Sequence, residues 1–270
     1  MLAWTLIIMA AALIGLSKSG FLSGAGLLIV PVTMIGLANT PGGANNEKLA
    51  LGLMLPLLIL GDLFATWQYR REWDKAIVRT LLVPTLAGVM IGGAMLYGLS
   101  RLGEKHAPVA ALLIRLEIGA ESVILVGLHY WRQWRGLPAK LLHRSTRAWL
   151  CGSFAGLSST LAHAAGPVVA MYLLPLNLDR RVYVGTVAFF FLFLNLVKLP
   201  AFMLAGQFDR TPWALAAGLV PVVALGAIVG KILVKRMNNN VFTAVTYALT
   251  FALGIYLLLD SAIRLVKSLG

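Results

Sequence analysis

The sequence contains few charged residues and almost no cysteine, and each shortage excludes a class of protein. Asp, Glu, Lys and Arg together make up 12% of the 270 residues, whereas soluble domains carry roughly 25%. The chain therefore holds no soluble domain of its own. Cys151 is its one cysteine, so neither an internal disulfide framework nor a thiolate metal cage can form. We expect Cys151 to be a small buried apolar residue.

Apolar residues replace the missing charge, in runs long enough to cross a membrane. A spanning helix needs about 20 apolar residues, and 59% of this sequence is apolar. The runs predict spanning helices at Asn45–Tyr69, Ala76–Leu99, Ala107–Tyr130, Arg181–Ala205, Thr211–Val234 and Val241–Ile263. The fold class that follows is an all-α polytopic membrane protein, with a single membrane domain over residues 1–270.

Two further apolar segments are interrupted at matching places in the two halves of the chain. They read GLSKSGFLSGAG at Gly15–Gly26 and GLSSTLAHAAGP at Gly156–Pro167. Unwound backbone survives at membrane depth only where protein or water satisfies its polar groups. A helix that restarts after such a break directs free N–H groups into the gap, where they attract anions. The predicted anion-binding residues in the breaks are Ser17, Lys18, Ser19, Ser23, Gly24, Gly26, Ser158, Ser159, Thr160, His163 and Gly166.

Both breaks also have a structural interpretation. Small residues let neighbouring helices approach closely, which accounts for the glycines of the breaks but leaves Lys18 unexplained. The same reasoning predicts close helix contacts at the spaced glycine pairs Gly88–Gly92 and Gly226–Gly230. His163 can bind an anion, carry a proton near neutral pH, or simply bond a backbone carbonyl as a neutral side chain. The sequence leaves these roles of His163 open.

Two ionisable residues, Asp62 and Lys198, fall inside predicted spanning helices. Charged groups are costly at that depth, so each is a candidate for function. Because the two lie at similar positions in equivalent helices, we expect them to line one polar cavity, either apart or as a pair. Asn195 belongs to the same substrate-binding set, and Asp62 and His163 are the candidates for proton coupling. A purely structural ion pair, or snorkelling of Lys198 to an interface, is the alternative.

The two halves of the chain align and predict an internal repeat. Asp74 matches Asp209, and Gly119 matches Gly254, at one common spacing. Each repeat is expected to hold a broken or re-entrant helical segment followed by three spanning helices. If the broken segments enter and leave on one side, the repeats are inverted, and Lys and Arg then show the stronger excess on the cytoplasmic side. We therefore favour inverted repeats, with a first repeat, a basic cytoplasmic linker and a second repeat at 1–131, 132–148 and 149–270.

Short motifs in both halves add a family resemblance. They are Gly24-Ala25-Gly26 before Pro31, Ala165-Gly166-Pro167, Leu55-Pro56-Leu57 before Gly61-Asp62-Leu63, Tyr172-Leu173-Leu174, and Val184-Gly185-Thr186 before Asn195 and Lys198-Leu199-Pro200. With these motifs the chain resembles the TauE/SafE family of sulfite exporters over nearly its whole length. The resemblance implies a bacterial-type inner-membrane permease, built on two repeats, for small sulfur anions such as sulfite and organosulfonates. Lys18 departs from the first family motif, where small residues are commoner.

Together these features predict a multi-pass secondary transporter that exports a small anion, sulfite or an organosulfonate, across the cytoplasmic membrane. The sequence carries no nucleotide-binding motif, so an ion gradient or the membrane potential would drive any uphill step. An importer of a sulfur-containing or other small anion and a passive channel are alternatives. A remote one is an intramembrane hydrolase that uses Ser158 or Ser159 with His163. The expected partners are the anion and the lipid bilayer, with a homodimer left open, and we expect no enzyme activity, nucleic acid, metal or cofactor.

Overall fold

The described part of the chain consists of helices joined by short turns, without strands. The computed structural model describes residues 2–19, 26–38, 40, 47–101, 144–209 and 211–236, with single positions or short runs between 116 and 135 and between 238 and 263. The helices are α1 (Leu2–Lys18), α2 (Gly26–Ala38), α3 (Glu47–Gln68), α4 (Lys75–Arg101), α6 (Arg144–Ala162), α7 (Gly166–Leu173), the 3₁₀ turn η2 (Leu174–Leu176), α8 (Arg180–Leu204) and α9 (Trp213–Arg236). The expectation of an all-α fold is confirmed for these residues.

Four of the described helices are long and apolar enough to cross a membrane. The apolar stretches are Lys48–Gln68, Lys75–Gly98, Arg180–Leu204 and Trp213–Leu233, and each matches a span predicted from hydropathy. The other two predicted spans, Ala107–Tyr130 and Val241–Ile263, are described only at scattered positions. The chain is therefore a multi-pass membrane protein.

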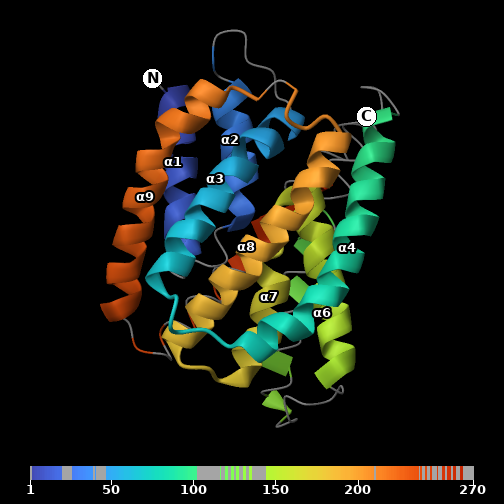
Figure 1. Ribbon diagram of the computed structural model, residues 1–270, viewed down its shortest axis with the longest axis vertical. Coiled ribbons are helices and arrows are strands. Elements are labelled where there is room, and N and C mark those ends of the chain that lie inside the picture. The colour runs from blue at the N-terminus through green and yellow to red at the C-terminus, as the bar shows by residue number, and fades with distance from the viewer. Residues whose placement is uncertain are drawn as a thin grey trace.

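Both predicted breaks separate a longer helix from a shorter one. α1 ends at Lys18 and α2 begins at Gly26, while α6 ends at Ala162 and α7 begins at Gly166. At 1.5 Å per residue, α2 is about 20 Å long and α7 about 12 Å, both short of the roughly 30 Å hydrocarbon core. In each pair the short helix packs against the helix before it. Figure 1 shows α1 beginning at the upper end of the molecule and α6 at the lower end.

Each of these longer helices packs against the last described helix of the other half. α1 lies along α9, and α6 lies along α4. The contacts are close because glycines face backbone: a Cβ atom on Gly15 would lie 2.2 Å from the carbonyl oxygen of Val223, and one on Gly156 2.3 Å from that of Thr85. Side chains never approach backbone this closely, so the glycines permit the contact. The packing interpretation of these two glycines is confirmed.

The apolar core is divided into two clusters, and their junction positions the site. One cluster gathers residues of α4, α6, α7 and α8, among them Tyr172 and Phe190. The other gathers residues of α1, α2, α3 and α9, among them Ile14 and Leu55. The polar side chains from the two breaks and from the middle of α3 and α8 are buried where these clusters meet.

Candidate functional site

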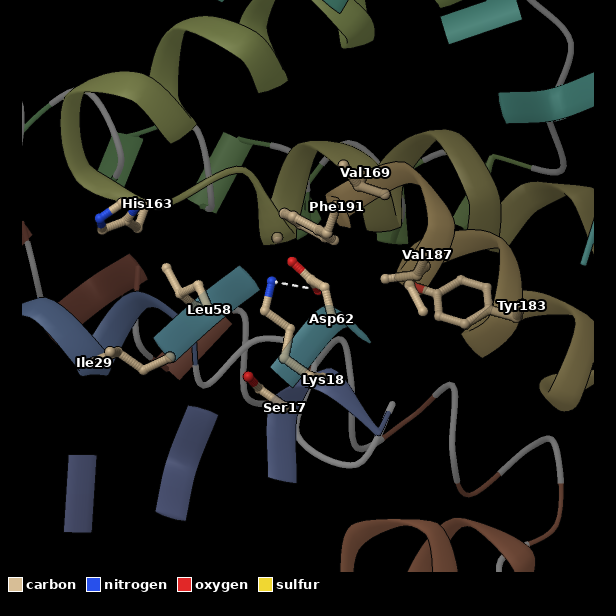
Figure 2. A pocket seen from close by; sticks show the side chains of 12 residues that line it. Ser17, Lys18, Ile29, Leu58, Asp62, His163, Val169, Tyr183, Val187 and Phe191 are labelled. Carbon is tan, nitrogen blue, oxygen red and sulfur yellow. Dashed lines mark ion pairs between the residues drawn. The ribbon is translucent and has the colours of Figure 1, made fainter. Parts of the chain in front are cut away.

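A buried cavity lies at this junction, between α1, α2, α3, α7 and α8. The space open to the centre of a water molecule is about 40 Å³, and one water needs about 10–15 Å³ by this measure. The cavity therefore has room for a few waters or one small polyatomic ion. Its apolar walls come from Ile29, Leu58, Val169, Val187, Ala188 and Phe191, and its polar lining from Ser17, Lys18, Asp62, His163, Gly166 and Tyr183 (Figure 2).

The strongest electrostatic contact in the cavity joins the end of α1 to the middle of α3. Lys18 is the last residue of α1, and its Nζ lies 2.9 Å from Oδ1 of Asp62 (Figure 2). Asn195 of α8 donates from Nδ2 to the other carboxylate oxygen of Asp62, at 2.6 Å. The face of the Phe191 ring also lies 4.3 Å from Lys18 Nζ, at cation–π distance. Both oxygens of the buried carboxylate are thus held by nitrogen donors from two different helices.

A second polar group lies one helical turn away, where Lys198 meets the end of α6. Lys198 Nζ donates to the carbonyl oxygen and the hydroxyl of Ser159, at 3.1 and 3.0 Å, and lies 2.7 Å from Nδ1 of His163. These three contacts use all three N–H donors of an ammonium group. A cation at the C-terminal end of a helix is also favoured by the helix dipole. Lys198 is fully buried but does not line the cavity.

The contacts of His163 fix its tautomer. Its Nε2 lies 3.1 Å from the carbonyl oxygen of Leu51, and because a carbonyl only accepts, Nε2 carries the proton. Nδ1 is then the acceptor for Lys198. His163 has a left-handed backbone, with φ of 55°, which turns the chain between α6 and α7. Both ring nitrogens are engaged in these contacts.

Three hydroxyl groups of the breaks donate to backbone carbonyl oxygens of the preceding helical turn. Ser17 donates to the carbonyl oxygen of Ile14, Ser19 to that of Leu16, and Thr160 to that of Gly156, at 3.1, 2.7 and 2.7 Å. Ser and Thr within helices commonly form such bonds with the preceding turn. Their hydroxyl protons are therefore committed to backbone, and of the three residues only Ser17 lines the cavity.

The remaining predicted residues are placed as follows. Gly166 begins α7 and lines the cavity, and since its N-cap residue is Ala165, no side chain caps that end. Because Gly166 is both the first residue of α7 and part of the cavity lining, the start of α7 faces the cavity. Ser158 is buried in α6, and Gly26 is the first residue of α2. The predicted residues Ser23 and Gly24 lie outside the described part of the chain.

The direct pairing of Asp62 with Lys198 that the sequence allowed is replaced by two separate groups. Asp62 pairs with Lys18, and Lys198 binds Ser159 and His163. Sequence reasoning also missed Phe191 and Tyr183, which lie in the wall of the cavity. The spacing of α8 carried a signal for Phe191, because residues four apart share a helix face and Asn195 had already been selected.

The buried charges of the site do not cancel. Lys18, Lys198 and Asp62 are 8%, 0% and 0% exposed, and in formal charge, with His163 counted as neutral, the two lysines outnumber the one carboxylate. An uncompensated charge away from water is costly, and a bound anion would neutralise it. Within the described residues, His, Cys, Asp and Glu side chains do not gather in a group that could hold a metal ion.

The comparisons with known proteins give a family. No curated protein and no solved structure matches the chain. The model of one protein family, described as sulfite exporter TauE/SafE, matches residues 7–257. This match spans both halves, and thus both breaks, α3 and α8 with their buried charges. The chain belongs to the TauE/SafE sulfite exporter family, whose members are membrane transporters.

Proposed function

We propose that the chain is a secondary transporter that exports a small anion, sulfite or an organosulfonate, and that the cavity is its substrate site. The observation that carries this proposal is that two buried lysines outnumber one buried carboxylate beside a space for a small ion. Lys18 would contact the anion directly, while Lys198 supplies a second positive charge one turn away. The start of α7 has no side-chain cap, so the N–H of Gly166 would add to the attraction, while Pro167 carries no N–H.

We further infer that the two halves are inverted repeats. Contacts between α4 and α6 recur between α9 and α1: a Cβ on Gly88 would meet the carbonyl oxygen of Ser153 at 1.9 Å, and one on Gly226 that of Ala12 at 2.6 Å. The beginning of α1 and the beginning of α6 lie at opposite ends of the molecule (Figure 1). Parallel repeats would begin at the same end, so this placement favours the inverted arrangement, with re-entrant broken segments.

The position of the cavity supports loading from the cytoplasm of a bacterial-type cell. Its lining residues on α8, from Tyr183 to Phe191, belong to the first half of that helix. At the same end of the molecule, basic residues gather where α3 ends and α8 begins, as is typical of a cytoplasmic face; they are Arg70, Arg71, Arg180 and Arg181. An inside-negative potential drives a loaded anion outward by about 2.3 kcal/mol per charge per 100 mV.

Flux measured in liposomes tests the proposed function. We expect the purified full-length chain to transport labelled sulfite or sulfoacetate with saturable kinetics, faster out of vesicles with an inside-negative potential, while chloride flux stays at the level of protein-free liposomes. A pH gradient across the same vesicles reports on proton coupling. Equal, non-saturating flux of all three anions would indicate a channel, and the lack of sulfite and sulfoacetate flux would contradict the proposal.

Cysteine labelling tests the inverted topology. Arg101 and Arg236, which occupy matching positions in the two halves, are both exposed. In a Cys151→Ala background, we expect a membrane-impermeant maleimide added to intact cells to label Arg101→Cys but not Arg236→Cys. Permeabilised cells provide the control, in which both cysteines should react. Labelling of both from outside would indicate parallel repeats.

A further inference from the structure

The carboxylate of Asp62 occupies the position that a substrate anion needs. We propose that Asp62 is an internal competitor, whose side chain fills the anion site in the absence of substrate and must release Lys18 before an anion binds. This inference rests on the proposed function and concerns the regulation of that same site. Three observations support it: the contacts of the carboxylate, the occupation of all three N–H donors of Lys198, and the balance of buried charge.

The geometry of Asp62 is that of a bound anion. One carboxylate oxygen, Oδ1, forms an ion pair with Lys18 Nζ at 2.9 Å, and the other, Oδ2, accepts a hydrogen bond from Asn195 Nδ2 at 2.6 Å. The side chain is fully buried and lines the cavity together with Lys18, so the Lys18 ammonium faces the space proposed for the substrate. Carboxylates and sulfur oxyanions both present paired, negatively charged oxygens to N–H donors. An anion held by Lys18 would therefore use the contact that Asp62 now makes.

Lys198 offers the anion no alternative while its present contacts persist. Its three donors are directed at the two oxygens of Ser159 and at Nδ1 of His163. Among the described cavity-lining residues, Lys18 is the one permanent cation. Substrate and Asp62 must consequently compete for the same ammonium group, and binding of the first requires neutralisation of the second.

The balance of charge in the site favours anion binding when Asp62 is neutral. With Asp62 ionised, a monovalent anion brings the buried total to zero but places a second negative charge beside the first. With Asp62 neutral, the anion is attracted by the charges of both lysines without that repulsion. The charged and titratable groups that face Asp62 are Lys18 from α1, Lys198 and Tyr183 from α8, and His163 from the link between α6 and α7. Protonation of Asp62 would therefore open the site to the anion.

Binding of sulfite and sulfoacetate to purified protein at pH 7.5 tests the proposal. We expect Asp62→Asn, which keeps the shape of the side chain but removes its charge, to bind both anions about tenfold more tightly than the unmodified chain, since about 1.4 kcal/mol of lost competition is a factor of ten. The matched control is Asp209→Asn, because Asp209 is an exposed aspartate paired with Lys48 at 3.7 Å; its affinity should not change. Folded Asp62→Asn protein with unchanged or weaker affinity would overturn the proposal.

Proton uptake by the unmodified chain gives an independent measurement, which also serves if Asp62→Asn does not fold. Sulfoacetate stays fully ionised near neutral pH, so calorimetry in two buffers of different ionisation enthalpy reports protons taken up by the protein. We expect an uptake that approaches one proton per anion and persists in His163→Asn, since Asn tolerates a left-handed backbone. Zero uptake, or uptake that vanishes in His163→Asn, would contradict the proposal. Failure of every variant to bind either anion would instead count against the proposed function.

Discussion

Lys198→Met is expected to reduce anion flux in liposomes by about 100-fold. The substitution leaves Lys18 and Asp62 as a neutral pair, so an anion entering the cavity would be an uncompensated buried charge. A factor of 100 in binding or rate corresponds to about 2.7 kcal/mol, and leaving a buried charge without its compensating partner costs at least that much. Sulfite flux, measured at equal protein density in the vesicles, is the readout.

The matched control for this variant is Lys75→Met. Lys75 is an exposed lysine at the first residue of α4, with its Nζ 5.8 Å from the centre of the Trp73 ring. The same change of charge and shape there should leave flux unaltered. Elution of both variants as a single peak in gel filtration would show that they fold. Native flux in folded Lys198→Met would remove Lys198 from the transport site.

Separate removal of the two partners of the cavity ion pair is expected to destabilise the protein unequally. Breaking a buried pair by removing one partner costs about 3–5 kcal/mol. Asp62→Leu leaves two buried lysines without a carboxylate, so its loss should lie at the upper end of this range. Lys18→Met leaves Asp62 with its hydrogen bond from Asn195 and the nearby charge of Lys198, so its loss should be smaller. Denaturant unfolding in detergent, followed by tryptophan fluorescence, measures both.

The double variant Lys18→Met/Asp62→Leu completes the comparison. Replacing both members of a buried pair by apolar residues is often neutral, so the double variant should recover most of the stability lost by Asp62→Leu. Asp209→Leu, at the exposed pair with Lys48, should cost no more than about 1 kcal/mol. Strictly additive losses from the two single changes would mean that Lys18 and Asp62 are not coupled.

Much of the architecture could be predicted from the sequence because it depends on properties of local segments. Run length and hydropathy identify a spanning helix such as α3 or α8 without knowledge of its neighbours. Glycine-rich interruptions likewise mark where α1 and α6 end. The pairing of α1 with α9 could not be predicted, since the close approach of Gly15 to Val223 is a property of two surfaces that are distant in the chain.

For the site, likewise, the individual residues could be predicted from the sequence but their pairing could not. Lys18, Asp62, His163 and Lys198 could be selected because ionisable groups are rare at membrane depth. Their pairing depended on height along α8: Asn195 and Lys198 share a face but differ by about 4.5 Å along the axis, so Asn195 reaches Asp62 while Lys198 reaches the end of α6. The bonds from the Ser and Thr hydroxyls to the preceding helical turn, by contrast, could have been predicted, because such bonds are common for Ser and Thr within helices.

Each of the two polar groups of the site comes from a single half of the chain, and this has a consequence for membrane insertion. Lys18 and Asp62 both come from the first half, while Ser159, His163 and Lys198 all come from the second. Each half can therefore leave the insertion machinery with its ionisable side chains already partnered, before the halves dock. Among the described hydrogen bonds of the site, those from Asn195 to Asp62 and from His163 to Leu51 have to wait for docking. A nascent chain arrested after α4 would thus expose no lone buried charge to lipid.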